Sequence, residues 1–436
     1  MKNVKLYQLW QSLLASYWFI PALMAASAVG LSLGMLRLDE TSQSDIIAAL
    51  GWTYTRDADG ARTILSVIAG SSITVATTAF SITIVALQLA SSQFGPRILR
   101  NFMQDRGNQV VLGTFIATFL YCLLVLRSVQ GRDDGQFLPQ LSVAFSIMLA
   151  TLNLAVLIYF IHHAAESIQA DNVVQRVSED LERTIEQLFP QQLGKGHKSS
   201  ESPVPADFAR RACPVHVTQR GYIQVIDDRL LMKVAQENNV LMRLLHRPGH
   251  FVVAKATLVM VYPGERVDKQ LASQINRAFV LGAQRTQQQD LDFAVEQLVE
   301  IAVRALSPGI NDPFTAMRCI DQLGAALCRL AQKDIPSPYR TDERGTLRII
   351  ANPITFADII DTAFDQIRQY SRSAVEVRIR LLEAIANIAA YTHQPQDHLV
   401  LKRHAQMIYH VHAESECESE RTAIEEQFLT VKKLLD

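Results

Sequence analysis

ILSVIAGSSITVATTAFSITIVALQLA, residues 64–90, is an unbroken apolar stretch that contains no Asp, Glu, Lys or Arg. A hydrocarbon core of about 30 Å is crossed by roughly 20 helical residues, so this stretch is long enough to span a membrane. Within it, small and hydroxyl-bearing residues recur at helical spacing. We therefore expect a transmembrane helix with one polar face.

Working outward, three further apolar stretches of spanning length are found at 16–36, 110–126 and 138–163. Only 18 of the first 163 residues are charged, about 11%, whereas the whole chain of 436 residues averages 19%. The remaining residues therefore carry about 25% charge, the usual level for globular chains. This contrast predicts a membrane part followed by a soluble part.

The predicted fold is a mainly α membrane protein with four N-terminal transmembrane helices, a small α+β module and an all-α cytoplasmic region. We expect four parts: a transmembrane domain at 1–163, a juxtamembrane helix and linker at 164–207, the α+β module at 208–263, and the helical domain at 264–436. The module is indicated by short β-rich runs around a turn at 247–250.

Lys and Arg are slightly more numerous in the loops on the N-terminal side of the predicted spans. By the positive-inside rule, and because an even number of spans places both ends together, we expect both termini in the cytoplasm. A net charge of −1 gives no electrostatic footprint for nucleic acid. Five scattered cysteines without CxxC spacing indicate neither a disulfide framework nor a zinc site.

One face of the 64–90 helix forms a stripe of small and polar side chains. At 100° per residue its members fall within about 40° of one line. The stripe consists of Ser66, Gly70, Thr74, Thr77, Ser81, Gln88 and Ser92. Such a stripe suits either the lining of an ion path or close packing between helices. No ionisable residue lies inside any span, which favours passive conduction, or none, over proton-coupled transport.

The loop after this helix carries Arg97, Arg100 and Arg106, and Pro96 and Gly107 are typical of the start and end of a short interfacial helix. These arginines suit lipid headgroups, anions at a pore mouth, or carboxylates of the soluble domain.

His162, His163 and Glu166 end the fourth span, with spacings that place each histidine near the glutamate on a helix. This arrangement is compatible with a metal or a pH-sensitive pair, although imidazoles are ordinary at membrane interfaces. No third ligand is indicated, so we predict no metal. We also find no cofactor-binding or catalytic motif.

Charged residues recur around a predicted helix corner at 304–313. Pro308 and Gly309 would end the first helix, whereas Asp312 would cap the next one. Before the corner, Glu296, Glu300 and Arg304 recur every four residues on one helix face. This spacing suits either a solvated salt-bridge face or a buried network that shapes a ligand pocket or subunit interface. The network would contain Arg285, Asp290, Glu296, Glu300, Arg304, Asn311 and Asp312.

Several runs of the sequence, spread along almost its whole length, carry a resemblance to a known family. They are FGPR at 94–97, GNQ at 107–109, LGTF at 112–115, YFIHH at 159–163, SPGINDP at 307–313 and FDQIRQY at 364–370. The chain resembles a family of predicted bacterial integral membrane proteins classed as a domain of unknown function. The resemblance implies a bacterial inner-membrane protein with four N-terminal spans and a cytoplasmic domain. It implies no activity and no catalytic residue.

These observations favour an oligomeric inner-membrane channel or channel-like protein for small ions, gated by its cytoplasmic domain. The expected partners are membrane lipids, further copies of the chain, and a small ion or ligand. The alternative is a non-conducting membrane-anchored sensor or scaffold that binds a cytoplasmic partner or ligand. An enzyme has no supporting motif.

Overall fold

The computed structural model describes residues 16–41, 58–98, 103, 105–129, 138–189, 204–410 and 418–436. The chain divides into two compact units, Met1–Asn172 and Val173–Asp436, which we describe separately.

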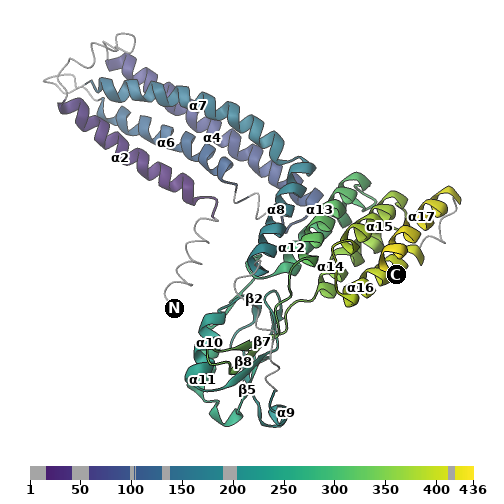
Figure 1. Ribbon diagram of the computed structural model, residues 1–436. Helices are drawn as coiled ribbons and strands as arrows, with labels where there is room; N and C mark the ends of the chain where they lie inside the picture. Colours follow the sequence, from purple (N-terminus) through teal and green to yellow (C-terminus); the bar gives the residue numbers. More distant parts are fainter. Residues whose placement is uncertain are drawn as a thin grey trace. The chain divides into compact units, whose positions relative to one another are not determined.

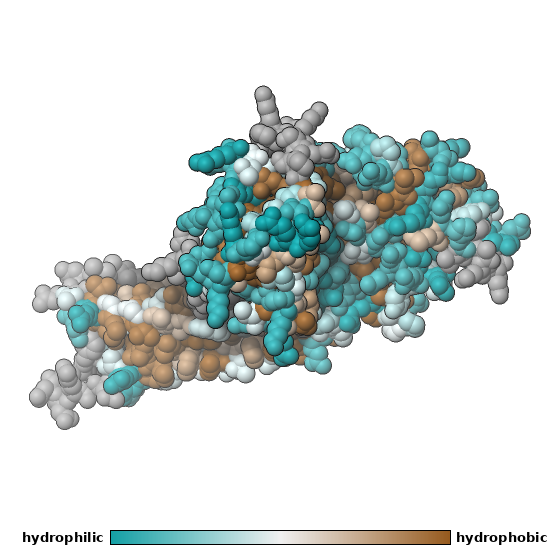
Figure 2. Space-filling view, turned by 90° about the horizontal axis from the view of Figure 1, so that it is seen from below, coloured by the Kyte–Doolittle hydropathy of each residue, from teal (hydrophilic) through white to brown (hydrophobic). Residues whose placement is uncertain are grey.

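The first unit contains four long helices, α2 (Phe19–Thr41), α4 (Ala58–Phe94), α6 (Arg106–Ser128) and α7 (Gln140–Ser167) (Figure 1). Each is long and apolar enough to cross a membrane. They correspond to the four predicted spans, and the chain is therefore a multi-pass membrane protein. Many of their side chains are apolar and exposed, and Figure 2 shows brown, hydrophobic residues over much of this unit's visible surface.

Helix α6 is the centre of this unit because it packs against α2, α4 and α7. Half of its apolar span is buried, compared with 17% for α2. Gly113 allows the close approach of α2, since a Cβ atom there would lie 2.5 Å from the Met24 sulfur and 3.3 Å from the Pro21 Cα. The sequence places small residues where helix backbones meet.

Polar side chains close the helix ends on one side of the unit. Asp39 of α2 accepts hydrogen bonds from the backbone amides of Leu141 at 2.8 Å and Ser142 at 3.0 Å, which start α7. Arg62 of α4 donates to the carbonyl of Val129, which ends α6, at 2.8 and 3.1 Å. The backbone groups that a helix leaves unpaired at its ends are thus satisfied by neighbouring helices.

Helix α8 (Ala170–Leu188) follows α7 and runs into the second unit. It is strongly amphipathic, and its apolar side is buried. On its buried side Ser178 donates to Gln322 of α13 at 2.7 Å, and Glu186 pairs with Lys333, which follows α13, at 2.8 Å.

The second unit holds an α+β module with two small sheets. One sheet has the order β1-β5-β3-β8-β7 and the other has the order β4-β2-β6. Its strands are β1 (Cys213–His216), β2 (Gly221–Ile226), β3 (Leu241–Leu244), β4 (Phe251–Val252), β5 (Thr257–Tyr262), β6 (Phe279–Gly282), β7 (Tyr339–Thr341) and β8 (Leu347–Ile350). Strands β3 and β8 are parallel, whereas the other paired strands are antiparallel. The short helices are α9 (Phe208–Arg211), α10 (Asp228–Glu237), the 3-10 turn η1 (Gly264–Arg266) and α11 (Lys269–Arg277).

The module takes three strands and one helix from residues 264–436, which were expected to form a mainly helical domain. Leu271 and Ile275 of α11, Phe279 of β6 and Ile349 of β8 share one buried apolar core with residues of β1–β5. The parallel pairing of β8 with β3 joins segments about 100 residues apart in sequence, and no local pattern predicts such a pairing.

The rest of the second unit is helical, as expected. Its helices are α12 (Leu291–Ala305), α13 (Pro313–Ala331), α14 (Phe356–Tyr370), α15 (Val375–Ala389), α16 (Pro395–His410) and α17 (Glu418–Leu435). Asp312 caps α13 by accepting from the Thr315 amide at 3.1 Å, and Pro313 is the first helical residue, so the predicted corner is confirmed.

Candidate functional site

The stripe on α4 lies on the outer surface of the first unit. All seven of its residues are exposed. The opposite face of α4 packs against α6 and α7 and buries mainly small and aliphatic residues. These are Ala61, Leu65, Ile68, Ala69, Ser72, Ala76, Ala79, Thr83, Ala86, Ala90 and Phe94. Close packing within the chain therefore uses the face opposite the stripe.

Exposed apolar side chains flank the stripe on both sides. Ile73 and Phe80 lie on one flank, with Val67 and Val85 on the other, and the exposed Ile84 lies at the edge of the stripe itself. Val67 is 64% exposed and Val85 is 57% exposed. The outer surface of α4 is therefore a polar line between two apolar margins, which distinguishes it from a uniformly lipid-like surface.

The stripe hydroxyls bond to the backbone of their own helix. Thr74 donates to the carbonyl of Gly70 at 2.8 Å, Thr77 to that of Ile73 at 2.9 Å, and Ser81 to that of Thr77 at 2.9 Å. A carbonyl oxygen can only accept, so each hydroxyl uses its single proton in this bond. The exposed hydroxyl oxygens are consequently available as acceptors, and the stripe can coordinate a cation but offers these protons to no anion.

A buried polar chain crosses the interior of the same unit. Asn153 of α7 donates to the Ser72 hydroxyl of α4 at 3.0 Å and accepts from Thr118 of α6 at 3.2 Å. All three side chains are less than 10% exposed. These two hydrogen bonds connect α4, α6 and α7 inside the unit. The sequence analysis did not propose it, although Ser72 interrupts the apolar side of α4 and Asn153 is polar within an apolar span.

Most of the short helix predicted between α4 and α6, residues 99–102 and 104, lies outside the described residues, and Met103 is helical. Pro96 and Arg97 belong to a turn, and Gly107 is the second residue of α6 rather than the end of a helix. The reason is the cap: Asp105 accepts from the Gly107 amide at 2.8 Å and starts α6 there. Arg97 and Arg106 are exposed, whereas Arg100 lies outside the described residues.

The two histidines at the end of α7 have different acidic partners. His162 pairs with Glu166 at 3.2 Å, but His163 turns to Asp105, with its Nε2 2.9 Å from the carboxylate. Gly107 is required beside this pair, since a Cβ atom there would lie 2.7 Å from His163 Nε2. Within the part of the chain that the structure describes, no group of three or more His, Cys, Asp or Glu side chains is placed to hold a metal ion.

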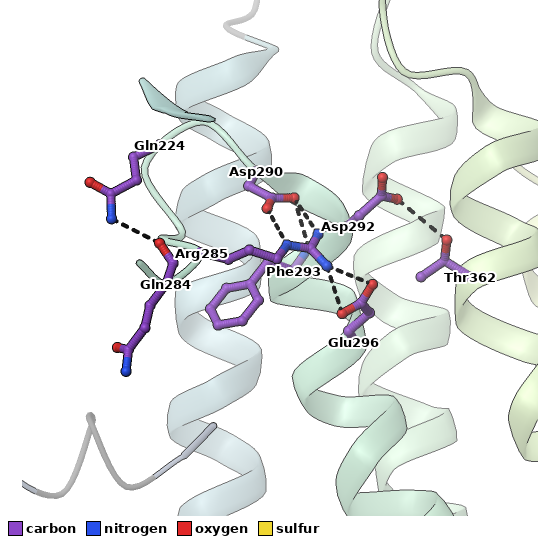
Figure 3. A network of polar contacts seen from close by, with 8 residues as sticks. All are labelled: Gln224, Gln284, Arg285, Asp290, Asp292, Phe293, Glu296 and Thr362. Atoms are coloured by element: carbon purple, nitrogen blue, oxygen red, sulfur yellow. Dashed lines mark hydrogen bonds and ion pairs between the residues drawn. The ribbon is translucent and has the colours of Figure 1, made fainter. Parts of the chain in front are cut away.

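In the second unit, part of the predicted charged network assembles around Arg285 (Figure 3). Its guanidinium donates to Asp290 at 2.7 and 2.8 Å and to both oxygens of Glu296 at 2.9 Å. Asp290 is 3% exposed and also caps α12 by accepting from the Phe293 amide at 3.0 Å. The guanidinium lies 5.3 Å from the centre of the Phe293 ring. These bonds join the loop after β6 to the start of α12.

Neighbouring turns complete this buried site. Gly249 has φ of 89°, and a Cβ atom there would lie 2.2 Å from Asp290 Oδ2, so only glycine fits. Burial alone would lower the pKa of Arg285, but its bonds to Asp290 and Glu296 outweigh burial and raise that pKa above its ordinary value. Burial, together with the charge of Asp290, raises the pKa of Asp292. Arg285, Asp290 and Glu296 thus form a largely buried ion-pair network, which we call the clamp.

The structure describes other contacts for the remaining predicted members. Glu300 and Arg304 are 3.5 Å apart on α12 and form a pair of their own. Asn311 is exposed and adopts a left-handed conformation with φ of 52°, whereas Asp312 is engaged as the α13 cap. Helical periodicity placed these residues on one helix and its following corner. It could not show which of them bind Arg285.

Comparison with known proteins places the whole arrangement in context. The model of a family described as predicted membrane protein (DUF2254) matches residues 15–387. An uncharacterized protein of Mycobacterium tuberculosis (strain H37Rv) is 32% identical over 382 residues, covering 85% of this chain and 71% of the relative. An uncharacterized protein of Mycobacterium bovis is similar to the same extent. No solved structure matches the chain significantly.

Proposed function

The chain belongs to the DUF2254 family of predicted membrane proteins, and we propose from the exposed stripe on α4 that it forms an oligomeric inner-membrane channel for small cations. In this proposal the α4 helices of several copies surround a shared axis. Their stripes face a water-filled path, and the second unit gates it. The observation that carries the proposal is the exposure of the whole stripe on the face of α4 that the chain's own helices leave uncovered.

The chemistry of the stripe supports a preference for cations. Hydroxyl groups whose protons point to carbonyls can coordinate a cation through their oxygens and replace part of its hydration shell, without placing a charge in the membrane. Small side chains such as Gly70 leave room, since nothing lies within 4 Å of a Cβ built there. The apolar margins, among them Ile73 and Val85, would contact neighbouring helices or lipid.

We also propose that the protein lies in a bacterial inner membrane with both termini in the cytoplasm, as the loop charges predict. A C-terminal alkaline phosphatase fusion should be inactive and a C-terminal green fluorescent protein fusion should be fluorescent. An active phosphatase fusion would refute this orientation.

The conduction test uses purified full-length protein in liposomes loaded with KCl. Wild type should release K⁺ faster than protein-free liposomes, with less movement of Cl⁻. Thr77→Leu should remove most of this flux, because an apolar constriction closes a narrow path by dewetting.

Thr78→Leu is the matched control. Thr78 is also exposed, and its hydroxyl donates to the carbonyl four residues earlier, as that of Thr77 does. It lies roughly 100° around the helix from Thr77 and outside the stripe. Equal loss of flux in both variants, or no wild-type flux across salts and pH, would overturn the proposal.

A further inference from the structure

The α+β module of the second unit contains a cavity of about 430 Å³. It opens between the turn after α10, the end of β5 with its following 3-10 turn, and the start of β8. Small-molecule sites in proteins commonly enclose about 300–1,000 Å³. The cavity is therefore large enough for a small metabolite.

The charged residues that line the cavity itself are both positive. Arg266 and Arg348 are the charged residues of its lining, and its lining contains neither Asp nor Glu. A second cavity, of about 470 Å³ between α13 and α15, is lined by two acidic residues and two arginines. The first cavity thus differs from an ordinary surface hollow by its cationic lining.

Both arginines are held in place by the same turn residue. Arg266 Nη1 donates to the carbonyls of Asn238 at 3.0 Å and Asn239 at 2.5 Å, while Arg348 Nη1 donates to the Asn239 side-chain oxygen at 2.7 Å. Asn239 is itself fixed in a left-handed turn with φ of 48°. Two guanidinium groups are consequently kept close together around one residue, an arrangement that like charges oppose.

Donors remain on both guanidinium groups. Among the described residues, no hydrogen bond uses Nε or Nη2 of Arg266 or Nη2 of Arg348. Asp342 binds Arg348 Nε at 2.9 Å and neutralises one of the two positive charges, which leaves an excess of one. Planar guanidinium groups with free N–H donors match the oxygens of phosphate groups.

The remaining wall is apolar and partly aromatic. The Tyr262 ring stacks on Phe208 with 5.8 Å between ring centres, and its hydroxyl donates to Asp207 at 3.0 Å. Leu241 and Leu347 line the cavity beside it. The cavity thus has an apolar, partly aromatic wall next to its charged end.

We propose that this cavity binds a small, water-soluble phosphate compound, with Arg266 and Arg348 contacting the phosphate oxygens. The site lies wholly within the second unit and is independent of conduction by the first.

The test titrates full-length protein in detergent with inorganic pyrophosphate by isothermal titration calorimetry at constant ionic strength. Binding should be saturable with one site per chain. Arg266→Gln should weaken it by about tenfold or more, since a hydrogen bond to a charged group contributes roughly 1.5–3 kcal/mol. Arg266 is exposed, and an unchanged melting temperature will verify that the variant folds.

Arg344→Gln is the control, because Arg344 is exposed on the turn between β7 and β8, carries the same charge and does not line the cavity. It should leave pyrophosphate affinity unchanged. Absence of saturable binding to wild type, or equal weakening by both substitutions, would overturn the proposal, since equal weakening indicates diffuse attraction by surface charge.

Discussion

Replacing Arg285 by Met should destabilise the second unit strongly. The side chain of Asp290 is 3% exposed and that of Arg285 18% exposed, so removal of the guanidinium leaves a buried carboxylate without its cation. Breaking a buried ion pair in this way costs about 3–5 kcal/mol. At about 2–4 °C per kcal/mol for a unit of this size, the melting temperature should fall by about 6–20 °C.

The matched control is Arg380→Met. Arg380 is 41% exposed and pairs with Asp321 at 3.6 Å and with Glu383 at 3.2 Å on the protein surface. Exposed pairs contribute about 0–1 kcal/mol, so its melting temperature should change little. Both variants are compared by thermal denaturation of the full-length protein in detergent, followed by circular dichroism.

A second substitution separates the charge effect from lost packing. Adding Asp290→Asn to Arg285→Met removes the uncompensated charge but keeps a side-chain oxygen for the Phe293 amide, so part of the lost stability should return. The reasoning is refuted if Arg285→Met shifts the melting temperature no more than Arg380→Met, or if Asp290→Asn deepens the loss.

Two further predictions concern buried polar groups. Asn153→Leu removes the bonds to Ser72 and Thr118 and should destabilise the first unit by about 1 kcal/mol, measured by denaturant unfolding in micelles; unchanged stability would contradict a role for this polar chain. In the second unit, burial lowers the pKa of His404 despite its bond to Asp361. The unfolded chain therefore binds a proton that the folded chain does not as pH falls below about 6.5, and stability should decrease there. His404→Gln should flatten this dependence between pH 7.5 and 5.5, and an equally steep loss would exclude His404 as its source.

The sequence predicted the membrane part well because bilayer thickness imposes a length and a composition on each span. It also located the cap at Asp312, since helix ends follow local rules. The polar stripe on α4 was likewise visible from helical periodicity. What periodicity could not reveal is that the stripe is exposed and that the opposite face is used for packing within the chain.

Features that depend on distant partners were not predicted. His163 pairs with Asp105, 58 residues away, rather than with nearby Glu166. Arg285 selects Asp290 and Glu296 from a larger set of charged residues, and β8 joins the sheet of β3. In each case several partners satisfy the local pattern, and only the tertiary fold decides among them. The cavity lined by Arg266 and Arg348 was not predicted for the same reason, because its lining comes from segments far apart in the sequence.

The central claim is that the stripe on α4 faces water. Single cysteines placed along α4 in a variant without native cysteines can be tested in membranes with a membrane-impermeant thiol reagent. Positions Thr74, Thr77 and Ser81 should react, whereas Ile73 and Val85, on the apolar margins, should not. Reactivity that follows the margins, or none at any of these positions, would contradict a water-filled path along the stripe.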